Sequence, residues 1–342
     1  MTTPASTSPT STVPELDGTG GRDGRVVVLA GGLSHERDVS LRSGRRVAEA
    51  LRDAGLTVDV LDVGAELLSD LEADPPSCVV PLLHGETGED GAVREVLELL
   101  AVPYVGSRPR DCRRAFDKCS AKDVVSHAGI ATPTSVQLPA QTFRELGAPR
   151  LMGAIVEHLG LPLVVKPVRG GSALGCTVVR HAEDLPSAMV GAYAYGDTAL
   201  LERFVEGFEV AVAVVEDEQG PRALPVVGIV PDGGSYDYTA RYTAGSTEFR
   251  VPAPLDASVA ERCREVAVTA HTALGLRDLS RSDLIVDADG EVWFLEVNVA
   301  PGLTETSTVP LAIDADGLDL GAVMAGLVAR AAQRRPTDAA LA

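Results

Sequence analysis

The segment 281–302, RSDLIVDADGEVWFLEVNVAPG, carries side chains that could bind a metal ion or stabilise charge. Asp283, Glu296 and Asn298 lie within runs of β-branched and apolar residues that are typical of buried strands. A buried carboxylate without a partner is strongly destabilising, so these acids need a cation, a hydrogen-bond donor or water beside them. The first question is therefore what the two acids face.

The residues Asp287–Gly290 separate two strand-like runs and predict a β-hairpin. If Val286 lies opposite Glu291, Asp283 lies opposite Phe294, and side chains alternate between two faces along each strand. One face then carries Asp283, Glu296 and Asn298, and the other carries Trp293, Leu295 and Val297. Two carboxylates and an amide, without His or Cys, favour Mg²⁺ or Mn²⁺. A solvated face of the hairpin is the alternative interpretation.

If a metal-bound nucleotide lies at this face, the chain must also supply cations and backbone donors for its phosphates. The segment 164–175, VVKPVRGGSALG, places Lys166 at the end of an apolar strand. In the loop that follows, Gly170, Gly171 and Gly175 allow the backbone to approach an anion closely. Lys118, in a preceding helix, is a second candidate phosphate partner. An ordinary glycine-rich turn and a solvated lysine are the alternatives.

The segment 232–249, DGGSYDYTARYTAGSTEF, contains Tyr236, Tyr238 and Tyr242, three of the six tyrosines of the chain. Glycines and threonines flank these aromatic residues, a composition that favours a segment able to close over a site. A surface loop whose tyrosines pack on neighbouring strands is an equally good interpretation.

The elements that must position these residues begin with an alternation of strands and helices. The apolar run 25–30 predicts a strand, and Val39, Val47 and Leu51 recur at the spacing of a helix that Gly55 ends. Strand-like runs at 57–63 and 77–83, with a helix-like run at 92–100, predict a parallel sheet up to about Gly106. Neither G-x-G-x-x-G nor G-x-x-x-x-G-K-[ST] occurs, so two common nucleotide-binding motifs are absent.

From Ser107 onward the pattern changes to that of an antiparallel α+β protein. The basic stretch 107–129 predicts a helix with Ser107 as its N-cap and Gly129 at its end. Strand pairs within 161–180 and 199–215, the second broken at Glu206-Gly207, predict antiparallel hairpins.

The composition limits the classes of partner. A length of 342 residues predicts two or three domains, and a net charge of −19 argues against nucleic acid and anionic membranes as partners. The five cysteines form no C-x-x-C pair, which indicates reduced thiols, and no apolar run approaches the ~20 residues of a membrane span. Residues 1–24 are rich in Ser, Thr, Pro and Gly and lack the apolar core of a signal peptide. We expect a disordered leader and a cytoplasmic protein.

Six segments occur in an order that resembles the D-alanine–D-alanine ligases of the ATP-grasp superfamily. They are GGLSHERDVS, LHGETGEDG, VVKPVRGGSALG, YDYTARY, RSDL and LEVNVAPGLT. The resemblance covers the chain from Arg25 to its final helix. It implies an ATP-grasp fold of mixed α/β and α+β class, with an N-terminal parallel, Rossmann-like domain and two α+β domains that grip ATP.

The resemblance also implies how the chain is divided and assembled. The expected parts are a leader at 1–24, an N-terminal substrate domain at 25–106, a central ATP-grasp subdomain at 107–201, a C-terminal subdomain with the metal site and a lid loop at 202–334, and a tail at 335–342. The implied partners are D-alanine and MgATP, with a second copy of the chain in a homodimer formed through the N-terminal domain.

By motif match, Glu36 is expected to hold the ammonium group of the first D-alanine and to join a hydrogen-bonded set with Ser172 and Tyr242. His84 is expected to place a substrate carboxylate or amine. The second substrate's carboxylate is assigned to Ser307. The residues implied for the oxyanion hole are Arg281 and the backbone N–H of Gly302.

The resemblance assigns a further set of residues to the nucleotide and the metal. The ATP-binding residues implied are Lys118, Lys166, Gly170, Gly171, Glu202 and Glu209. The ligands implied for Mg²⁺ or Mn²⁺, with two ions expected, are Asp283, Glu296 and Asn298. The metal and the lysines would neutralise charge during transfer of the γ-phosphoryl group of ATP.

The implied reaction converts one D-alanine to D-alanyl phosphate and lets the amine of a second attack it, giving D-alanyl-D-alanine for peptidoglycan precursors.

Some positions depart from the common pattern: Arg241 replaces a lysine, Ala173 replaces a serine, Val299 and Ala300 replace a threonine and a more polar residue, and Thr308 replaces a leucine beside the second substrate. A related ligase with another acceptor, such as D-lactate, D-serine or another amino acid, is one alternative. A non-catalytic binding protein is the other, although retention of the catalytic and metal residues argues against it.

Overall fold

The structure is a computed structural model that describes residues 24–232 and 247–334. The leader (except Gly24), the C-terminal tail and the tyrosine-rich segment with Tyr242 and Arg241 lie outside the described residues. None of the helices within those two ranges combines the length and apolarity that a membrane span requires.

The N-terminal unit contains the predicted parallel sheet. Strand β1 (Val26–Leu29) lies between β2 (Val58–Leu61) and β3 (Cys78–Pro81), and both pairings are parallel. All four residues of β1 are buried, which explains why this strand is continuously apolar. Helices of this unit are α1 (Arg37–Asp53), α2 (Leu67–Ala73), α3 (Glu86–Glu89) and α4 (Ala92–Leu99).

The basic stretch after Ser107 forms two helices, α5 (Pro109–Phe116) and α6 (Lys118–His127), so the prediction of a single helix is wrong. The break is at Asp117, whose backbone is extended and whose carboxylate caps α6 by accepting from Ser120 N at 3.0 Å. Ser107 is not the predicted cap, because its hydroxyl oxygen accepts instead from Arg277 N at 3.1 Å. The break places Lys118 in the first turn of α6.

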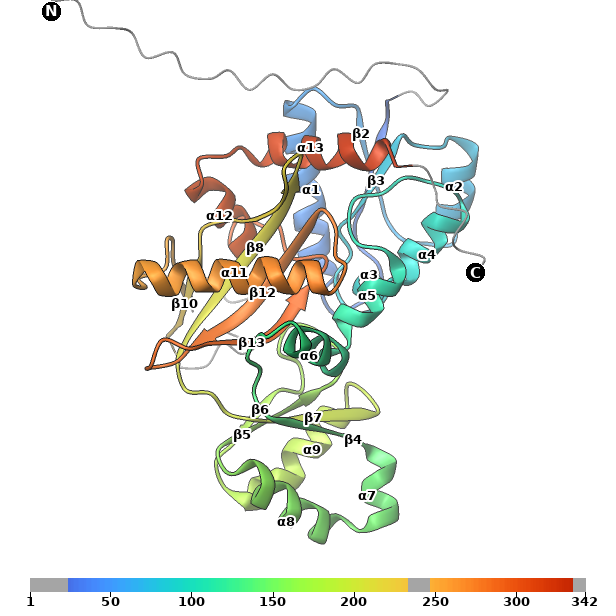
Figure 1. Ribbon diagram of the computed structural model, residues 1–342. Coiled ribbons are helices and arrows are strands. Elements are labelled where there is room, and N and C mark those ends of the chain that lie inside the picture. Colours follow the sequence, from blue (N-terminus) through green and yellow to red (C-terminus); the bar gives the residue numbers. More distant parts are fainter. Residues whose placement is uncertain (1–23, 233–246, 335–342) are drawn as a thin grey trace, which may run out of the picture.

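A four-stranded antiparallel sheet follows, in the order β4 (Ser135–Pro139), β7 (Thr198–Arg203), β5 (Leu163–Pro167) and β6 (Thr177–Val179). The helices α7 (Ala140–Leu146), α8 (Ala148–Leu159) and α9 (Leu185–Tyr193) and the 3₁₀ turn η1 (Ala182–Asp184) complete this part. Figure 1 shows it as the lower part of the molecule, with its helices on the side away from the larger sheet.

The third sheet has the order β11 (Thr247–Arg250), β10 (Val227–Pro231), β8 (Phe208–Asp217), β12 (Leu279–Val286) and β13 (Val292–Asn298), with β9 (Gly220–Ala223) paired to β8. All its pairings are antiparallel, as the α+β prediction requires. The predicted hairpin within 199–215 is wrong, because β7 belongs to the four-stranded sheet and β8 to this one, so the break at Glu206-Gly207 is the crossing between two sheets. Helix α11 (Ala257–Ala273) covers one face. Helices α12 (Thr308–Ala315) and α13 (Leu320–Ala332) pack between the other face and the N-terminal unit (Figure 1).

The hairpin of β12 and β13 corrects the predicted register. Val286 pairs with Val292, not with Glu291, and a β-bulge between Asp283 and Leu284 leaves Leu295 unpaired. Phe294 and Val297 are therefore both in the core, and the predicted separation of Leu295 from Glu296 onto opposite faces is wrong. Asp283 pairs with Glu296, not with the predicted Phe294, because the shift at the turn and the bulge together move the register by two residues. A shift of two keeps Asp283 and Glu296 on the same face, as predicted.

Candidate active site

Two cavities meet where the three sheets approach one another. A polar cavity of about 240 Å³ lies between the N-terminal unit and the third sheet. A larger cavity of about 920 Å³ lies between the four-stranded sheet and the third sheet. Both are lined by Gly171, Ile229, Asp283 and Glu296. The two predicted carboxylates therefore stand at the junction of the cavities.

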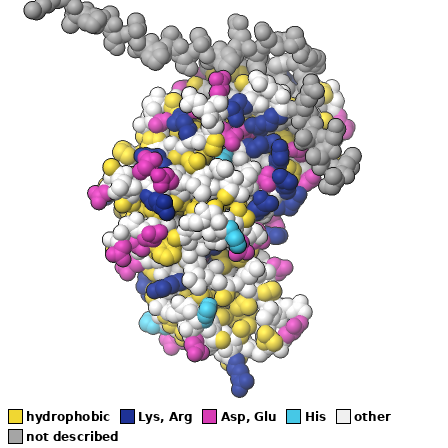
Figure 2. Space-filling view, in the orientation of Figure 1, with side chains coloured by type: hydrophobic (Ala, Val, Ile, Leu, Met, Phe, Trp, Pro, Cys, Tyr) yellow, Lys and Arg dark blue, Asp and Glu magenta, His cyan; other side chains and the backbone are white. Residues whose placement is uncertain are grey.

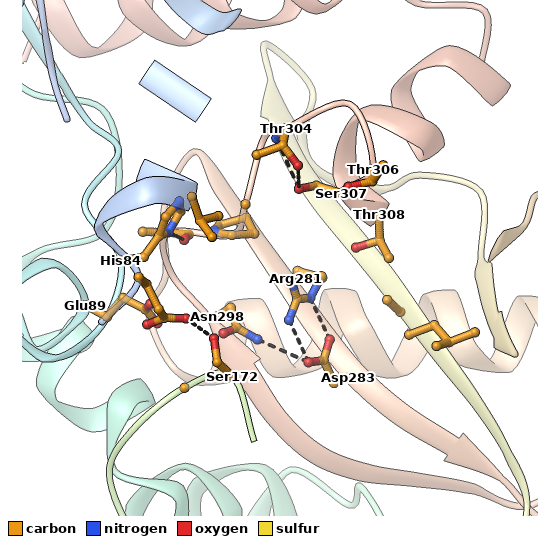
Figure 3. Close-up of a pocket in the computed structure, with 18 of the residues that line it drawn as sticks. His84, Glu89, Ser172, Arg281, Asp283, Asn298, Thr304, Thr306, Ser307 and Thr308 are labelled. Atoms are coloured by element: carbon orange, nitrogen blue, oxygen red, sulfur yellow. Dashed lines mark hydrogen bonds and ion pairs between the residues drawn. The ribbon is translucent and has the colours of Figure 1, made fainter. Parts of the chain in front are cut away.

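The carboxylate face of the hairpin carries its own compensating cations. Arg281 donates to both oxygens of Asp283, at 2.6 and 2.7 Å, and Asn298 Nδ2 donates to Asp283 Oδ2 at 3.3 Å (Figure 3). Lys118 Nζ lies 3.3 Å from Glu296 Oε2. The face is thus a cluster of oppositely charged groups, not a solvated surface, and its acids are partnered before any ligand binds.

The donor atoms of this face suit a hard divalent cation. Asp283, Glu296 and Asn298 offer two carboxylates and an amide oxygen, the ligand type that Mg²⁺ and Mn²⁺ prefer. No group of three or more His, Cys, Asp and Glu side chains within 24–232 and 247–334 is arranged to hold a metal on its own. A cation here therefore depends on the amide and on oxygens supplied by a phosphate ligand or water.

Opposite the hairpin, the N-terminal unit and the glycine-rich loop meet in the polar cavity. The hydroxyl of Ser172 donates to Glu36, which lies immediately before α1. Ser172 and Ala173 adopt positive φ angles of 54° and 55°, so the loop turns tightly there. Residues in this conformation are strained and tend to occur at functional sites, which supports a functional reading of the loop over an ordinary turn.

His84 lines the polar cavity, but both of its ring nitrogens have partners within the chain. Nδ1 lies 2.9 Å from Ala300 O, and Nε2 lies 3.4 Å from Ser43 Oγ. Burial lowers the pKa of His84, although the nearby carboxylate of Glu36 opposes this. The neutral imidazole is therefore the form that the structure favours.

The loop that follows Asn298 forms another wall of the polar cavity. Gly302 is a close-approach position, because an added Cβ would lie 2.9 Å from Ser307 Oγ. Ser307 Oγ accepts from Thr304 N at 3.1 Å and lies 2.8 Å from Thr304 Oγ1. Thr308 also lines the cavity, and its buried hydroxyl has no hydrogen-bond partner among the described residues.

The larger cavity is lined by Lys118, Lys166 and Glu202, the last two from neighbouring strands β5 and β7. Lys166 Nζ lies 2.5 Å from Glu202 Oε1, and Lys122 contacts the other oxygen of the same carboxylate. Burial opposes the charge on Lys166, but Glu202 raises its pKa above the usual range, so Lys166 keeps its proton. Burial lowers the pKa of Lys122, and the neighbouring charge of Lys166 acts in the same direction. Lys118 and Lys166 thus bring two amines to this cavity, which favours a bound anion.

The glycine-rich loop contributes its backbone to the larger cavity. Lys118 Nζ donates to Gly170 O at 2.7 Å, which ties the loop to α6. Gly170 has a φ of 130°, a conformation that favours glycine. Gly171 lines both cavities, and Glu209, on β8, lines the larger one beside Ile229 and Ile285.

The structure thus sorts the residues predicted from the sequence into two groups. The polar cavity is lined by Glu36, His84, Ser172, Arg281, Asn298, Gly302 and Ser307. The larger cavity is lined by Lys118, Lys166, Gly170, Glu202 and Glu209. Asp283, Glu296 and Gly171 line both, and Tyr242 lies outside the described residues.

Sequence reasoning missed three buried residues at or near these cavities. Glu89 lines the polar cavity, and burial together with the charge of Glu36 raises its pKa to about 8. Lys122 and Ser43 make the contacts described above. Glu89 belongs to the quoted segment LHGETGEDG, so that motif could have indicated it, whereas Lys122 and Ser43 gave no local signal.

Comparison with known proteins adds a separate line of observation. A family model described as the D-ala D-ala ligase C-terminus matches residues 124–329. The D-alanine–D-alanine ligase of Bordetella avium is 39% identical over 310 residues, covering 91% of this chain and 95% of that protein. The D-alanine–D-alanine ligase of Desulforudis audaxviator is 40% identical over 312 residues, covering 91% and 99%.

Solved structures agree with these sequence matches. The VanG D-Ala:D-Ser ligase from Enterococcus faecalis superposes with a TM-score of 0.76 at 29% identity, covering 90% of this chain and 99% of that chain. The D-alanine-D-alanine ligase from Coxiella burnetii superposes with a TM-score of 0.75, covering 91% and 95%, and at 22% identity it is a likeness of fold alone.

Proposed function

Because this chain belongs to the D-alanine–D-alanine ligase family and has its ATP-grasp fold, we propose that it joins two D-alanines through a D-alanyl phosphate, using ATP. The product, D-alanyl-D-alanine, serves the synthesis of peptidoglycan precursors. The relatives of about 40% identity are named for D-alanine on both sides, which favours D-alanine over D-lactate or D-serine as the acceptor.

One observation of the structure carries this proposal. Asp283 and Glu296 stand at the junction between a cavity lined by lysines and a smaller polar cavity. A ligase that transfers a phosphoryl group from ATP to an amino acid needs this arrangement, because the nucleotide and the acid must meet at one charged point. A protein that only bound an amino acid would have no need of the second, cation-lined cavity.

We assign the larger cavity to ATP and the polar cavity to the two D-alanines. Lys118 and Lys166, held at the cavity wall by Glu296 and Glu202, would face the phosphates, and Glu209 would lie near the adenine and ribose. Asp283, Glu296 and Asn298 would hold Mg²⁺ or Mn²⁺, in a site for two ions. A bound cation would neutralise phosphate charge and act as a Lewis acid on a phosphoryl oxygen.

In the polar cavity, Glu36 would bind the ammonium group of the first D-alanine, with Ser172 fixing the carboxylate of Glu36 by its hydrogen bond. The carboxylate of this D-alanine attacks the γ-phosphorus of ATP, and ADP leaves. The amine of the second D-alanine then attacks the carbonyl carbon, a C–N bond forms, and phosphate leaves as the C–O bond breaks. Arg281 and the N–H of Gly302 would stabilise the negative charge on the carbonyl oxygen.

Two finer properties belong to the same proposal. We propose a homodimer formed through the N-terminal unit, which light scattering of the purified chain would test. We also propose a cytoplasmic location. All five cysteines are unpaired, which is in keeping with a reducing compartment.

The test is ATP- and Mg²⁺-dependent phosphate release with D-alanine alone, with D-alanine plus D-lactate, and with a panel of D-amino acids. Turnover with D-alanine alone, and identification of the dipeptide by mass spectrometry, are the expected results. Turnover only with a mixed pair would show that the acceptor is the other compound of that pair, not D-alanine. Absence of turnover with every substrate would remove the ligase proposal altogether.

A further inference from the structure

Ser43 is a fully buried residue of α1 that touches the loop carrying Gly302, although it lines neither cavity. Its Oγ accepts a hydrogen bond from the backbone N–H of Leu303 at 3.1 Å. The same Oγ lies 3.4 Å from His84 Nε2. One hydroxyl of the N-terminal unit thus contacts both a side chain of its own unit and the backbone of the oxyanion loop, defined here as residues 300–303.

The direction of these hydrogen bonds follows from the donors available. Ala300 O can only accept, so His84 Nδ1 carries the ring proton and donates to it at 2.9 Å. In the neutral ring Nε2 is then an acceptor, and the Ser43 hydroxyl donates to it while its oxygen accepts from Leu303 N–H. A single tautomer of neutral His84 satisfies every contact of the chain Leu303–Ser43–His84–Ala300.

The two ends of this chain hold the oxyanion loop on either side of Gly302. Ala300 O lies two residues before it and Leu303 N one residue after it. Only Pro301 and Gly302 lie between the two anchored groups, Ala300 O and Leu303 N. An N–H that stabilises the charge developing on a carbonyl oxygen must be placed to within a fraction of an ångström. Fixing the loop at both ends restricts the direction of the Gly302 N–H.

We propose that Ser43 is a positioning residue for the ligation step, acting through His84 and the backbone of Leu303 to orient the Gly302 N–H toward the reacting carbonyl. This inference rests on the proposed function, since it takes Gly302 as an oxyanion donor. It gives His84 a role in supporting the loop in addition to lining the cavity. It also links α1 of the N-terminal unit to the loop that carries the Gly302 N–H.

A matched control exists one turn away on the same helix. Ser40 is also fully buried, accepts from Gly31 N at 2.8 Å and donates to Leu82 O at 2.6 Å. Both of its partners belong to the N-terminal unit. Ser40→Ala therefore removes the same number of buried hydrogen bonds as Ser43→Ala but leaves the oxyanion loop untouched.

The first experiment compares Ser43→Ala with Ser40→Ala in steady-state kinetics and thermal unfolding. We expect both variants to lose a similar amount of thermal stability. Ser43→Ala alone should lower kcat, by about 10- to 100-fold, with the KM values for ATP and D-alanine changed less than about threefold. Equal kcat values for the two variants would show that Ser43 only packs, and would overturn the proposal.

A second measurement does not depend on turnover. Hydrogen exchange of the amides in 300–304 should become faster in Ser43→Ala and stay at the wild-type rate in Ser40→Ala. In the double variant Ser43→Ala/His84→Ala, the fold loss of kcat should be smaller than the product of the two single losses, because the two variants share the Ser43–His84 contact, while the Leu303 contact belongs to Ser43 alone. Additive losses, or unchanged exchange, would contradict the proposal. The wild-type protein could instead prove inactive on D-alanine while hydrogen exchange of 300–304 is still faster in Ser43→Ala. That result would contradict only the proposed function.

Discussion

Arg281 binds Asp283 through both of its carboxylate oxygens, two residues away on the same face of β12. The residue assigned to the oxyanion hole is thus paired with a residue assigned to the metal. Each charge is partly buried, and removing one partner of such a pair leaves the other uncompensated. When no ligand is bound, the charge of Asp283 is therefore balanced within β12 itself, whereas Glu296 is paired with Lys118 of α6.

Replacing the guanidinium tests this pair directly. Arg281→Lys keeps the positive charge but cannot form the two parallel hydrogen bonds to Asp283. We expect kcat to fall by about 100-fold or more, the loss typical of one oxyanion donor, while the protein remains folded. Kinetics and circular dichroism of the variant are the measurements. A kcat near the wild-type value would exclude Arg281 from the oxyanion hole.

The metal assignment is tested at Glu296. Glu296→Gln has almost the same shape but removes the negative charge that faces Lys118 and the proposed cation. Turnover should fall by at least about 100-fold at every Mg²⁺ concentration, with the melting temperature nearly unchanged. Titration with Mn²⁺, followed by electron paramagnetic resonance in the presence of ADP, should show weakened binding. A variant with ordinary activity and Mn²⁺ affinity would show that the acid has another role.

The hydroxyl of Thr308, which has no hydrogen-bond partner within 24–232 and 247–334, predicts an effect on acceptor choice. A buried hydroxyl without a partner costs about 1–3 kcal/mol, and a hydrogen-bonding group on the acceptor can recover part of this. Thr308→Val should therefore leave kcat/KM with D-alanine unchanged or higher, and lower the ratio of D-serine to D-alanine turnover by about tenfold. Thr308→Ser is the control that keeps the hydroxyl. Equal losses with both acceptors would mean that the hydroxyl contacts a group common to both, such as the carboxylate.

Glu89 predicts a pH dependence of stability. Its pKa is about 8 in the folded protein, above its usual 4.5, because of burial and the charge of Glu36. Below about pH 4.5 the acid is protonated in both states and has no effect. Between about pH 4.5 and 8 unfolding releases its proton, so the free energy of unfolding decreases as pH rises, by at most about 1.4 kcal/mol per pH unit.

The neutral variant Glu89→Gln isolates this contribution. Denaturant unfolding of both proteins from pH 5 to 8 should show the variant gaining stability relative to wild type as pH rises. A difference between the two proteins that does not change with pH would mean that Glu89 is ionised in the folded state.

The carboxylate face shows how far strand periodicity can be trusted. Alternation along the sequence correctly grouped Asp283, Glu296 and Asn298, but the register from which it did so was wrong. With Val286 opposite Val292, a regular ladder would pair Asp283 with Leu295. The bulge instead pairs Asp283 with Glu296, two residues beyond the predicted partner Phe294, and so keeps both acids on one face. It accompanies the packing of Phe294 and Val297 in the core, which no local pattern reports.

The parallel and antiparallel sheets followed from the order and composition of their strands, because period and apolarity are local properties. The contacts between buried side chains could not be predicted from local sequence. Lys122 meets Glu202 from 80 positions away, and Ser43 meets Leu303 from 260 positions away. Each of these side chains looks like an ordinary polar residue of a helix in its own neighbourhood, and only the packed fold gives it a partner.

The bulge has one more consequence, for the shape of the larger cavity, which we assign to ATP. Consecutive side chains of a regular strand point in opposite directions, yet Leu295 and Glu296 both line this cavity. Adjacent residues thus supply an apolar side chain and a carboxylate to the same cavity. Deletion of Leu295 would leave Asp283 opposite Glu296 but would remove this apolar side chain from the cavity wall.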